Sequence, residues 1–184
     1  MPPKSALLVI DVQQELFSGA AHEGDAVMAR IAALADEARA TGVPVIYVQH
    51  DGAEGELVAE GTPGWELHEA VRPADGDLVV HKRVSDSFHG TGLAGTLREL
   101  GVERVYVTGF ATQFCVDATS RRATSEGFDV VLVSDGHTTF AELEGALPPE
   151  TIIAHHNMTL SNLAYGAHRV VIQPATEVDF SAAA

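Results

Sequence analysis

Asp11, Lys82 and Cys115 are side chains of types that cooperate in hydrolysis, and each lies at or near the end of an apolar run. Cys115 is the only cysteine among 184 residues, so no disulfide can form within the chain. A cysteine attacks as its thiolate, which a helix N-terminus and a nearby ammonium group both favour. Asp11 can accept the thiol proton and later deliver it to a leaving nitrogen. The three side chains therefore offer a nucleophile, a base and electrostatic support.

The turn before Cys115, with the sequence GFATQFC, adds backbone N–H groups that can bind the oxyanion of a tetrahedral intermediate. Each of the three side chains also has a purely structural explanation. A lone cysteine at a helix start more often packs as a small apolar residue, Asp11 can cap the following loop, and Lys82 can be a solvated strand end. The residue types alone leave both interpretations open.

Short apolar runs alternate with longer amphipathic segments along the chain, and no internal repeat interrupts them. The predicted strands are 6–11, 44–49, 77–82, 104–109, 129–135 and 168–172, and the predicted helices are 25–42, 92–101, 115–127 and 149–166. This alternation predicts an α/β fold with a mostly parallel sheet and helices on both faces. Such sheets bind ligands outside the carboxyl ends of their strands, so Asp11, Lys82 and Cys115 are expected to converge at one edge of the sheet.

The composition predicts one globular domain that spans residues 1–184. Hydrophobic residues make up 46% of the chain and charged residues 20%, which is typical of a soluble protein. The formal net charge of −15 repels phosphate backbones and anionic membrane surfaces, so neither nucleic acid nor a membrane is an expected partner. The first apolar run is too short for a signal peptide or a spanning helix, and we expect a cytoplasmic protein.

Four segments have the sequences LLVIDVQQELF, VVHKRVSDSFHGTGL, VYVTGFATQFCVDATSRRATSEGFDVVLVSDGHTT and HHNMTL. Together they resemble the motifs of the isochorismatase-like cysteine hydrolases, a superfamily that includes nicotinamidases and N-carbamoylsarcosine amidohydrolase. The resemblance runs from about residue 5 to residue 173, in order along nearly the whole chain.

The resemblance implies a three-layer Rossmann-like fold whose six strands have the order 3-2-1-4-5-6. It also implies that Asp11, Lys82 and Cys115 form a catalytic triad. A cis peptide bond between Phe110 and Ala111 is implied as well, with the N–H groups of Ala111 and Cys115 directed at the oxyanion. The family commonly forms oligomers, so a homodimer or homotetramer is expected.

The reaction implied by the resemblance is attack by Cys115 on the amide or carbamoyl group of a small molecule, which gives a thioester and releases ammonia or an amine. Water activated by Asp11 then completes hydrolysis, without a cofactor. An alternative within the same family is hydrolysis of the enol ether of isochorismate, which releases pyruvate. Some of those enzymes lack the cysteine, so Cys115 favours amide chemistry. A second alternative is a non-enzymatic domain that has kept an idle triad.

Aromatic residues near the expected strand exits are candidates for the walls of a substrate pocket, because such pockets are mostly apolar. The candidate substrate contacts are Gln13, Phe17, Trp65, Phe88 and Phe114, with Phe140 as a further aromatic near a strand exit. Phe17 and Trp65 rank first, because the resemblance implies pocket aromatics near both places.

The resemblance also raises the question of a metal, since nicotinamidases of this family bind one through an Asp-x-His pair after the second strand. The corresponding segment here has the sequence VQHDGAEG, in which His50 precedes Asp51 and the pair is broken. His50, Asp51 and His68 could still meet near the pocket, but satisfied loop or core side chains explain them better. No metal is expected.

Overall fold

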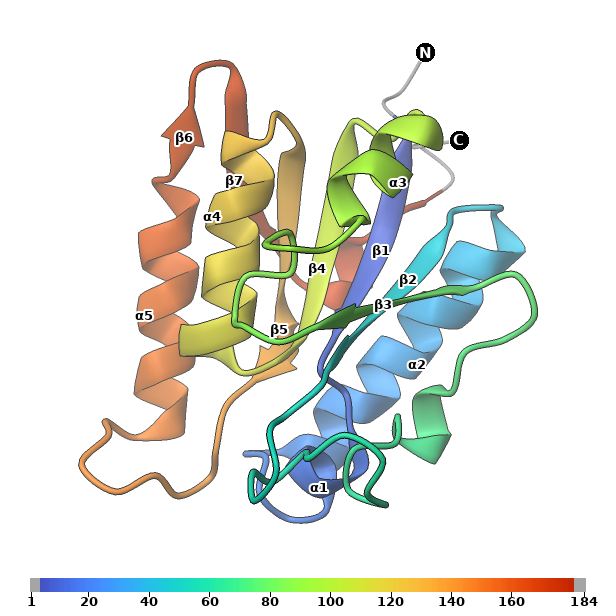
Figure 1. The fold of residues 1–184 in the computed structure, drawn as a ribbon. Coiled ribbons are helices and arrows are strands. Elements are labelled where there is room, and N and C mark those ends of the chain that lie inside the picture. The colour runs from blue at the N-terminus through green and yellow to red at the C-terminus, as the bar shows by residue number, and fades with distance from the viewer. Residues whose placement is uncertain (1–3, 181–184) are drawn as a thin grey trace.

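A computed structural model describes residues 4–180 of the chain (Figure 1). Its strands are β1 (Ser5–Ile10), β2 (Val45–His50), β3 (Leu78–Lys82), β4 (Arg104–Phe110), β5 (Asp129–Thr138), β6 (Ala164–Tyr165) and β7 (His168–Gln173). Its α-helices are α1 (Gln14–Phe17), α2 (Gly24–Ala40), α3 (Leu93–Glu99), α4 (Asp117–Ser125) and α5 (Pro149–Ser161). Single 3-10 turns occur at Glu69–Val71 and Ala175–Glu177, and a π-helical turn at Thr112–Val116 leads directly into α4.

The strands form one sheet in the order β3-β2-β1-β4-β5-β7-β6. The six strands expected from the sequence are parallel neighbours in the expected order, with β7 as the sixth, so the predicted α/β fold is confirmed. The chain moves outward from β1 in one direction through β2 and β3, and in the other through β4, β5 and β7. The strand order therefore reverses between β1 and β4, where an open sheet leaves a crevice at its carboxyl edge.

The predicted count of six strands was wrong by one. Residues 164 and 165 form the short antiparallel strand β6 beside β7, where the sequence interpretation extended a helix to Gly166. Helix α5 ends at Ser161, and Gly166 with φ 61° makes the tight turn between β6 and β7. A left-handed backbone is easy for glycine in a hairpin turn, which is why this glycine closes a hairpin here instead of a helix.

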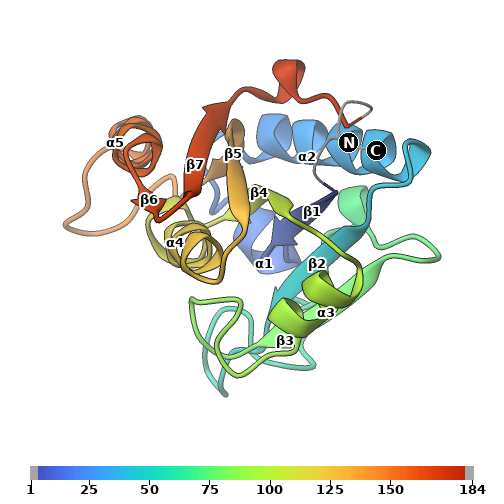
Figure 2. The same ribbon diagram turned by 90° about the horizontal axis from the view of Figure 1, so that it is seen from above.

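Helices cover both faces of the sheet, as Figure 2 shows from above. Helix α2 packs on one face against Leu7 and Val9, and α3, α4 and α5 lie on the other face, where Ala6, Leu8 and Ile10 are buried. All six residues of β1 are buried, which explains the uninterrupted apolar run of residues 6–10. Within residues 4–180, no helix is both long and apolar enough to cross a membrane.

Candidate active site

Asp11 follows β1 at the reversal of strand order, and the neighbouring strands hold its backbone in an unusual conformation. Its φ of 50° lies in the left-handed region, which is uncommon for a residue with a side chain. The amide of Asp11 donates to the carbonyl of Val48 at 2.8 Å, which continues the pairing of β1 with β2 past the last strand residue. The strained backbone is thus fixed by the sheet, and Asp11 is buried at the carboxyl edge.

Cys115 is placed by a close contact between β4 and β1. Gly109 has a φ of 117°, and a Cβ at this position would lie 2.0 Å from the carbonyl oxygen of Ile10, so only glycine fits. The next peptide bond, between Phe110 and Ala111, is cis. The chain then turns, with the carbonyl of Ala111 accepting from the amides of Phe114 (3.0 Å) and Val116 (3.2 Å). This turn brings Cys115 back toward Asp11.

Lys82, the last residue of β3, joins the other two side chains. Its fully buried Nζ donates to Asp11 Oδ2 at 2.7 Å, to Cys115 Sγ at 3.1 Å and to the carbonyl of Val84 at 3.2 Å. These bonds match the three hydrogens of an ammonium group. Asp11 Oδ1 is also buried, and it has no hydrogen-bond partner among the described residues. Asp11 and Cys115 both line the same cavity.

Burial and neighbouring charges set the protonation states of these groups. Burial alone would lower the pKa of Lys82, but attraction to Asp11 and Cys115 outweighs it and raises that pKa, so the ammonium stays charged. Burial, with the negative charge of Asp11, raises the pKa of the Cys115 thiol to about 12, although Lys82 acts in the opposite direction. Lys82 favours the thiolate, as the sequence suggested, but burial and Asp11 outweigh it. The resting group is therefore a thiol, and it needs a base, the role that the sequence suggested for Asp11.

A cavity of about 490 Å³ opens beside the thiol. Its lining is mostly apolar and consists of Leu16, Gly55, Leu57, Val58, Phe110, Ala111, Phe114 and Phe140, together with the polar or ionisable residues Asp11, His50, Glu56, Ser85 and Cys115. Among the described residues, no Lys or Arg belongs to this lining. The space is large enough for a small organic molecule.

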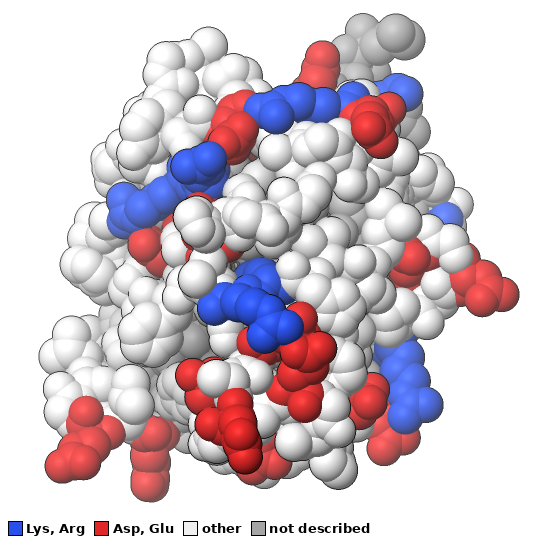
Figure 3. Space-filling model, in the orientation of Figure 1, with Lys and Arg blue, Asp and Glu red and all other residues white. Residues whose placement is uncertain are grey.

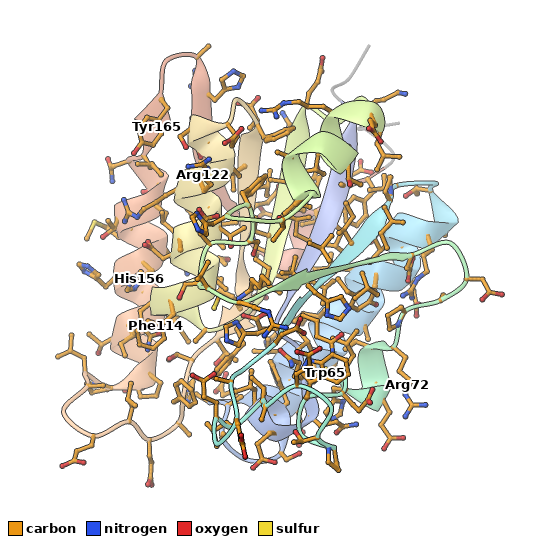
Figure 4. The ribbon with its side chains drawn as sticks, viewed as in Figure 1. Trp65, Arg72, Phe114, Arg122, His156 and Tyr165 are labelled. Atoms are coloured by element: carbon orange, nitrogen blue, oxygen red, sulfur yellow. The ribbon has the colours of Figure 1, made fainter. Side chains whose placement is uncertain are left out.

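The structure brings together seven residues named from the sequence: Asp11, Lys82, Phe110, Ala111, Phe114, Cys115 and Phe140. All except Lys82 line the cavity, and Lys82 lies behind the thiol and the carboxylate. Phe114 is 47% exposed because it projects from the turn instead of packing into the core. Trp65 and Phe114 lie well apart in Figure 4, on different sides of this region.

Two predicted substrate contacts are core residues instead. Phe17 in α1 is buried in the apolar cluster on the α2 face, with its ring edge-to-face to Phe110 at 5.8 Å between centroids. Phe88 is buried on the opposite face and stacks on Phe128 at 6.1 Å. Neither residue lines the cavity, because each packs against an aromatic ring of its own cluster.

Gln13 and Trp65, also predicted as substrate contacts, hold the loops around the cavity. The fully buried side chain of Gln13 accepts from the amide of His50 at 3.0 Å and donates to the carbonyl of Trp65 at 2.8 Å. Trp65 donates through Nε1 to Asp51 at 2.9 Å and stacks on His81. Both are absent from the cavity lining because their polar atoms are occupied by other parts of the chain.

The three residues weighed as metal ligands have separate partners. His50 Nδ1 lies 3.5 Å from Lys82 Nζ, Asp51 interacts with Trp65 and His81, and His68 accepts from the amide of Ala70. Burial, and after it the charge of Lys82, lowers the pKa of His50. In residues 4–180, no group of three or more His, Cys, Asp or Glu side chains is arranged to hold a metal ion. His50, Asp51 and His68 therefore do not form the metal site that the resemblance to nicotinamidases would imply.

Sequence reasoning missed most of the cavity wall. His50 was considered only as a metal ligand, and Glu56, Leu57 and Val58 belong to a loop whose sequence has no periodicity that indicates which side chains face inward. Phe140, in contrast, was named from the sequence as an aromatic residue near a strand exit, and it lines the cavity.

Comparison with known proteins extends these observations. A family model described as the Isochorismatase domain matches residues 5–148 of the chain. Two streptothricin hydrolases from Streptomyces noursei are each 37% identical, across 98% and 96% of this chain but 73% and 65% of their own lengths. Nicotinamidase 3 from Arabidopsis thaliana is 28% identical, over 88% of this chain and 81% of its own. A crystal structure of an isochorismatase from Pseudomonas putida KT2440 matches with a TM-score of 0.86 at 30% identity, covering 97% of this chain and 93% of that one.

Proposed function

Because the chain belongs to the isochorismatase family of hydrolases, we propose that it is a cysteine amidohydrolase that cleaves a C–N bond of a small amide or carbamoyl compound. The proposal rests mainly on one observation about the triad. The ammonium group of Lys82 bonds both Asp11 and Cys115, the second oxygen of Asp11 is buried and has no hydrogen-bond partner among the described residues, and both Asp11 and Cys115 line the cavity. A carboxylate held in this way is suited to take the proton of the neighbouring thiol.

The first half of the reaction forms a thioester. Asp11 Oδ1 takes the proton of Cys115 as Sγ attacks the substrate carbonyl carbon, and the carbonyl oxygen becomes an oxyanion. The N–H groups of Ala111 and Cys115 stabilise that oxyanion. When the C–N bond breaks, the proton held by Asp11 passes to the leaving nitrogen, and ammonia or an amine departs.

The second half releases the acid. A water molecule gives a proton to Asp11 and attacks the thioester carbonyl, and the thiolate leaves as a carboxylic acid forms. Cys115 then takes back its proton. Lys82 remains protonated throughout, since its pKa is raised by Asp11 and Cys115 against the opposing effect of burial. Its charge stabilises both the carboxylate and the transient thiolate.

The cavity supports an amide over the enol ether alternative. Isochorismate is a dianion, which needs cationic groups for recognition, whereas the cavity lining of the described residues contains two carboxylates and no Lys or Arg. Acidic side chains also gather on the lower part of the face shown in Figure 3, below the central basic atoms. We therefore infer a substrate that is uncharged or cationic and has an apolar part to fill the space beside Phe114 and Phe140.

The test is release of ammonia or amine from a panel of small amides and carbamoyl compounds, neutral, cationic and anionic, by wild type and by Cys115→Ala. Pyruvate release from isochorismate is measured in parallel. We expect turnover of neutral or cationic amides by wild type alone, and a thioester mass on the intact wild-type protein after rapid acid quenching. Full amide turnover by Cys115→Ala would overturn the proposal, as would pyruvate release with no amide cleavage.

A further inference from the structure

We propose that His137 is a positioning residue, which holds the turn that carries Cys115 by binding Thr112, and that Asn157 fixes the orientation of its ring. This inference rests on the proposed function, because it assigns the support of the same nucleophile. His137 lies near the end of β5, beyond residue 135, where the strand predicted from the sequence ended.

The hydrogen bonds around His137 leave its ring one orientation. The side chain is 1% exposed, and its Nδ1 and Nε2 lie 2.8 Å from Thr112 Oγ1 and 3.0 Å from Asn157 Oδ1. The amide nitrogen of Asn157 donates to the carbonyl of Ser134 at 3.1 Å, so its oxygen faces the ring. Nε2 therefore carries the proton, and Nδ1 accepts from the Thr112 hydroxyl.

In the neutral imidazole, Nδ1 accepts from the Thr112 hydroxyl, whereas a protonated ring would donate to that hydroxyl oxygen instead. Complete burial lowers the pKa of His137 to about 4, so the ring is neutral near pH 7. Because its two nitrogens lie on opposite sides of a rigid ring, His137 connects α5, through Asn157, to the turn after β4. A smaller or flexible side chain could not span the same two partners without loss of geometry.

Thr112 is the residue through which this connection reaches the nucleophile. It begins the π-helical turn Thr112–Val116, and it follows Ala111, whose amide is proposed to bind the oxyanion. The side-chain hydroxyl of Thr112 is hydrogen-bonded to His137, and the backbone carbonyl of Thr112 accepts from the amide of Asp117 at the start of α4. Both ends of the turn are thus fixed, which sets the position of Cys115 between them.

The test compares two substitutions of Thr112 with a matched control. Thr112→Val removes the hydroxyl and keeps the shape, and Thr112→Ser restores the hydroxyl. Thr108→Val is the control, because Thr108 is equally buried in β4 and its hydroxyl donates to the carbonyl of Leu8, away from the turn. For each variant we would measure melting temperature, kcat and KM on an amide substrate, and the rate at which iodoacetamide alkylates Cys115.

We expect Thr112→Val to lower kcat and the alkylation rate about 10-fold or more, since small displacements of a reacting group have effects of this size. KM should change less than about twofold, and Thr112→Ser should recover most of the rate. Thr108→Val should change only the melting temperature. His137→Leu should resemble Thr112→Val, and the double variant should be little worse than either single one, because the two residues act as a unit.

The inference would be overturned if Thr112→Val and Thr108→Val had equal kcat values and equal rates of Cys115 alkylation, with similar melting temperatures. If His137→Leu does not fold, the comparison of Thr112→Val and Thr112→Ser with the control Thr108→Val still tests the inference. The alkylation rate needs no knowledge of the substrate, so this result is separate from the proposed function: failure to hydrolyse amides leaves the alkylation comparison intact.

Discussion

Lys82 and Arg83 are adjacent in the chain and both pair with carboxylates, but in opposite surroundings. Lys82 is fully buried and bonds Asp11, whose side chain is 3% exposed, at 2.7 Å. Arg83 is 65% exposed and bonds Glu60, whose side chain is 52% exposed, at 2.6 Å. Successive residues at a strand end point to opposite sides, so one lies in the site and the other on the surface. The distances are nearly equal, so the length of the ion pair does not distinguish the two pairs, whereas burial does.

The difference teaches that the length of an ion pair says little about what it does. At the surface, water and salt screen the charges, and such pairs contribute about 0–1 kcal/mol. In the interior each charge depends on its partner, and removal of one leaves the other without solvent or counterion. The same dependence makes the buried pair chemically useful, because Lys82 holds the carboxylate of Asp11 in place beside the thiol.

The largest effect expected from this comparison is that of Lys82→Met, which leaves the buried carboxylate of Asp11 unpaired. We expect a loss of about 3–5 kcal/mol in the free energy of unfolding, measured by urea denaturation, together with loss of amide turnover. Asp11→Asn combined with Lys82→Met should recover part of the stability, since neither charge is then stranded. No difference in stability between the single and double variants would show that the pair is not coupled as its burial indicates.

A second effect separates the charge of Asp11 from its role as a base. Asp11→Asn should lower turnover by about 10²–10⁴-fold, since no group is left to take the thiol proton. The same change should make Cys115 easier to alkylate at a given pH, because burial and then the charge of Asp11 raise the pKa of this thiol to about 12. Alkylation rates against pH, for wild type and variant, measure the shift toward lower pH. A shift toward higher pH would contradict the assigned electrostatics.

An intermediate effect is expected from Glu56, the second carboxylate of the cavity lining. Glu56→Gln should raise KM for cationic amides about 5-fold to 10-fold and leave KM for neutral amides unchanged, as for removal of a partly exposed charge partner. Gln keeps an acceptor for the amide of Ala53, which the carboxylate now binds at 2.9 Å. Glu54→Gln, in the same loop but outside the lining, is the matched control. An equal change in KM for cationic and for neutral amides would show that Glu56 does not recognise the charge of the substrate.

The smallest effect completes the comparison. Arg83→Ala removes the exposed partner of Glu60 and should leave the free energy of unfolding almost unchanged, with kcat unaltered. Urea denaturation at low and high salt would check it, since any contribution of this pair should fade as salt screens it. A loss as large as that of Lys82→Met would mean that exposure does not separate the two pairs.

The sequence predicted the positions of the chemically active side chains better than the cavity around them. Asp11 and Lys82 end apolar strands, and parallel topology alone places strand ends at one edge, so their convergence followed from the pattern of elements. The composition of the cavity wall depends on which side of a loop or helix faces inward. Phe17 and Phe88 face the core because each packs against another aromatic ring there. No local spacing encodes such partners.

The same limit explains why His137 escaped notice. Gly136 resembles a turn residue, and the predicted strand stopped at Asp135, whereas β5 continues to Thr138 after a register shift against β4 between Val107 and Gly109. The continuation depends on pairing with another strand, which is a tertiary property. A single histidine after an apparent turn carries no sign of the two polar partners that bury it.

The loop of residues 52–60 has a consequence for protein engineering. Its two ends are joined, since the amide of Gly52 donates to the carbonyl of Val58 at 3.0 Å and the amide of Glu60 donates to the carbonyl of Gly52 at 3.1 Å. The loop supplies Glu56 and Leu57 to the cavity, while the triad comes from strand ends and the turn after β4. Exchange or lengthening of residues 53–57 would therefore alter substrate choice as a module, with the hydrolytic machinery inherited unchanged.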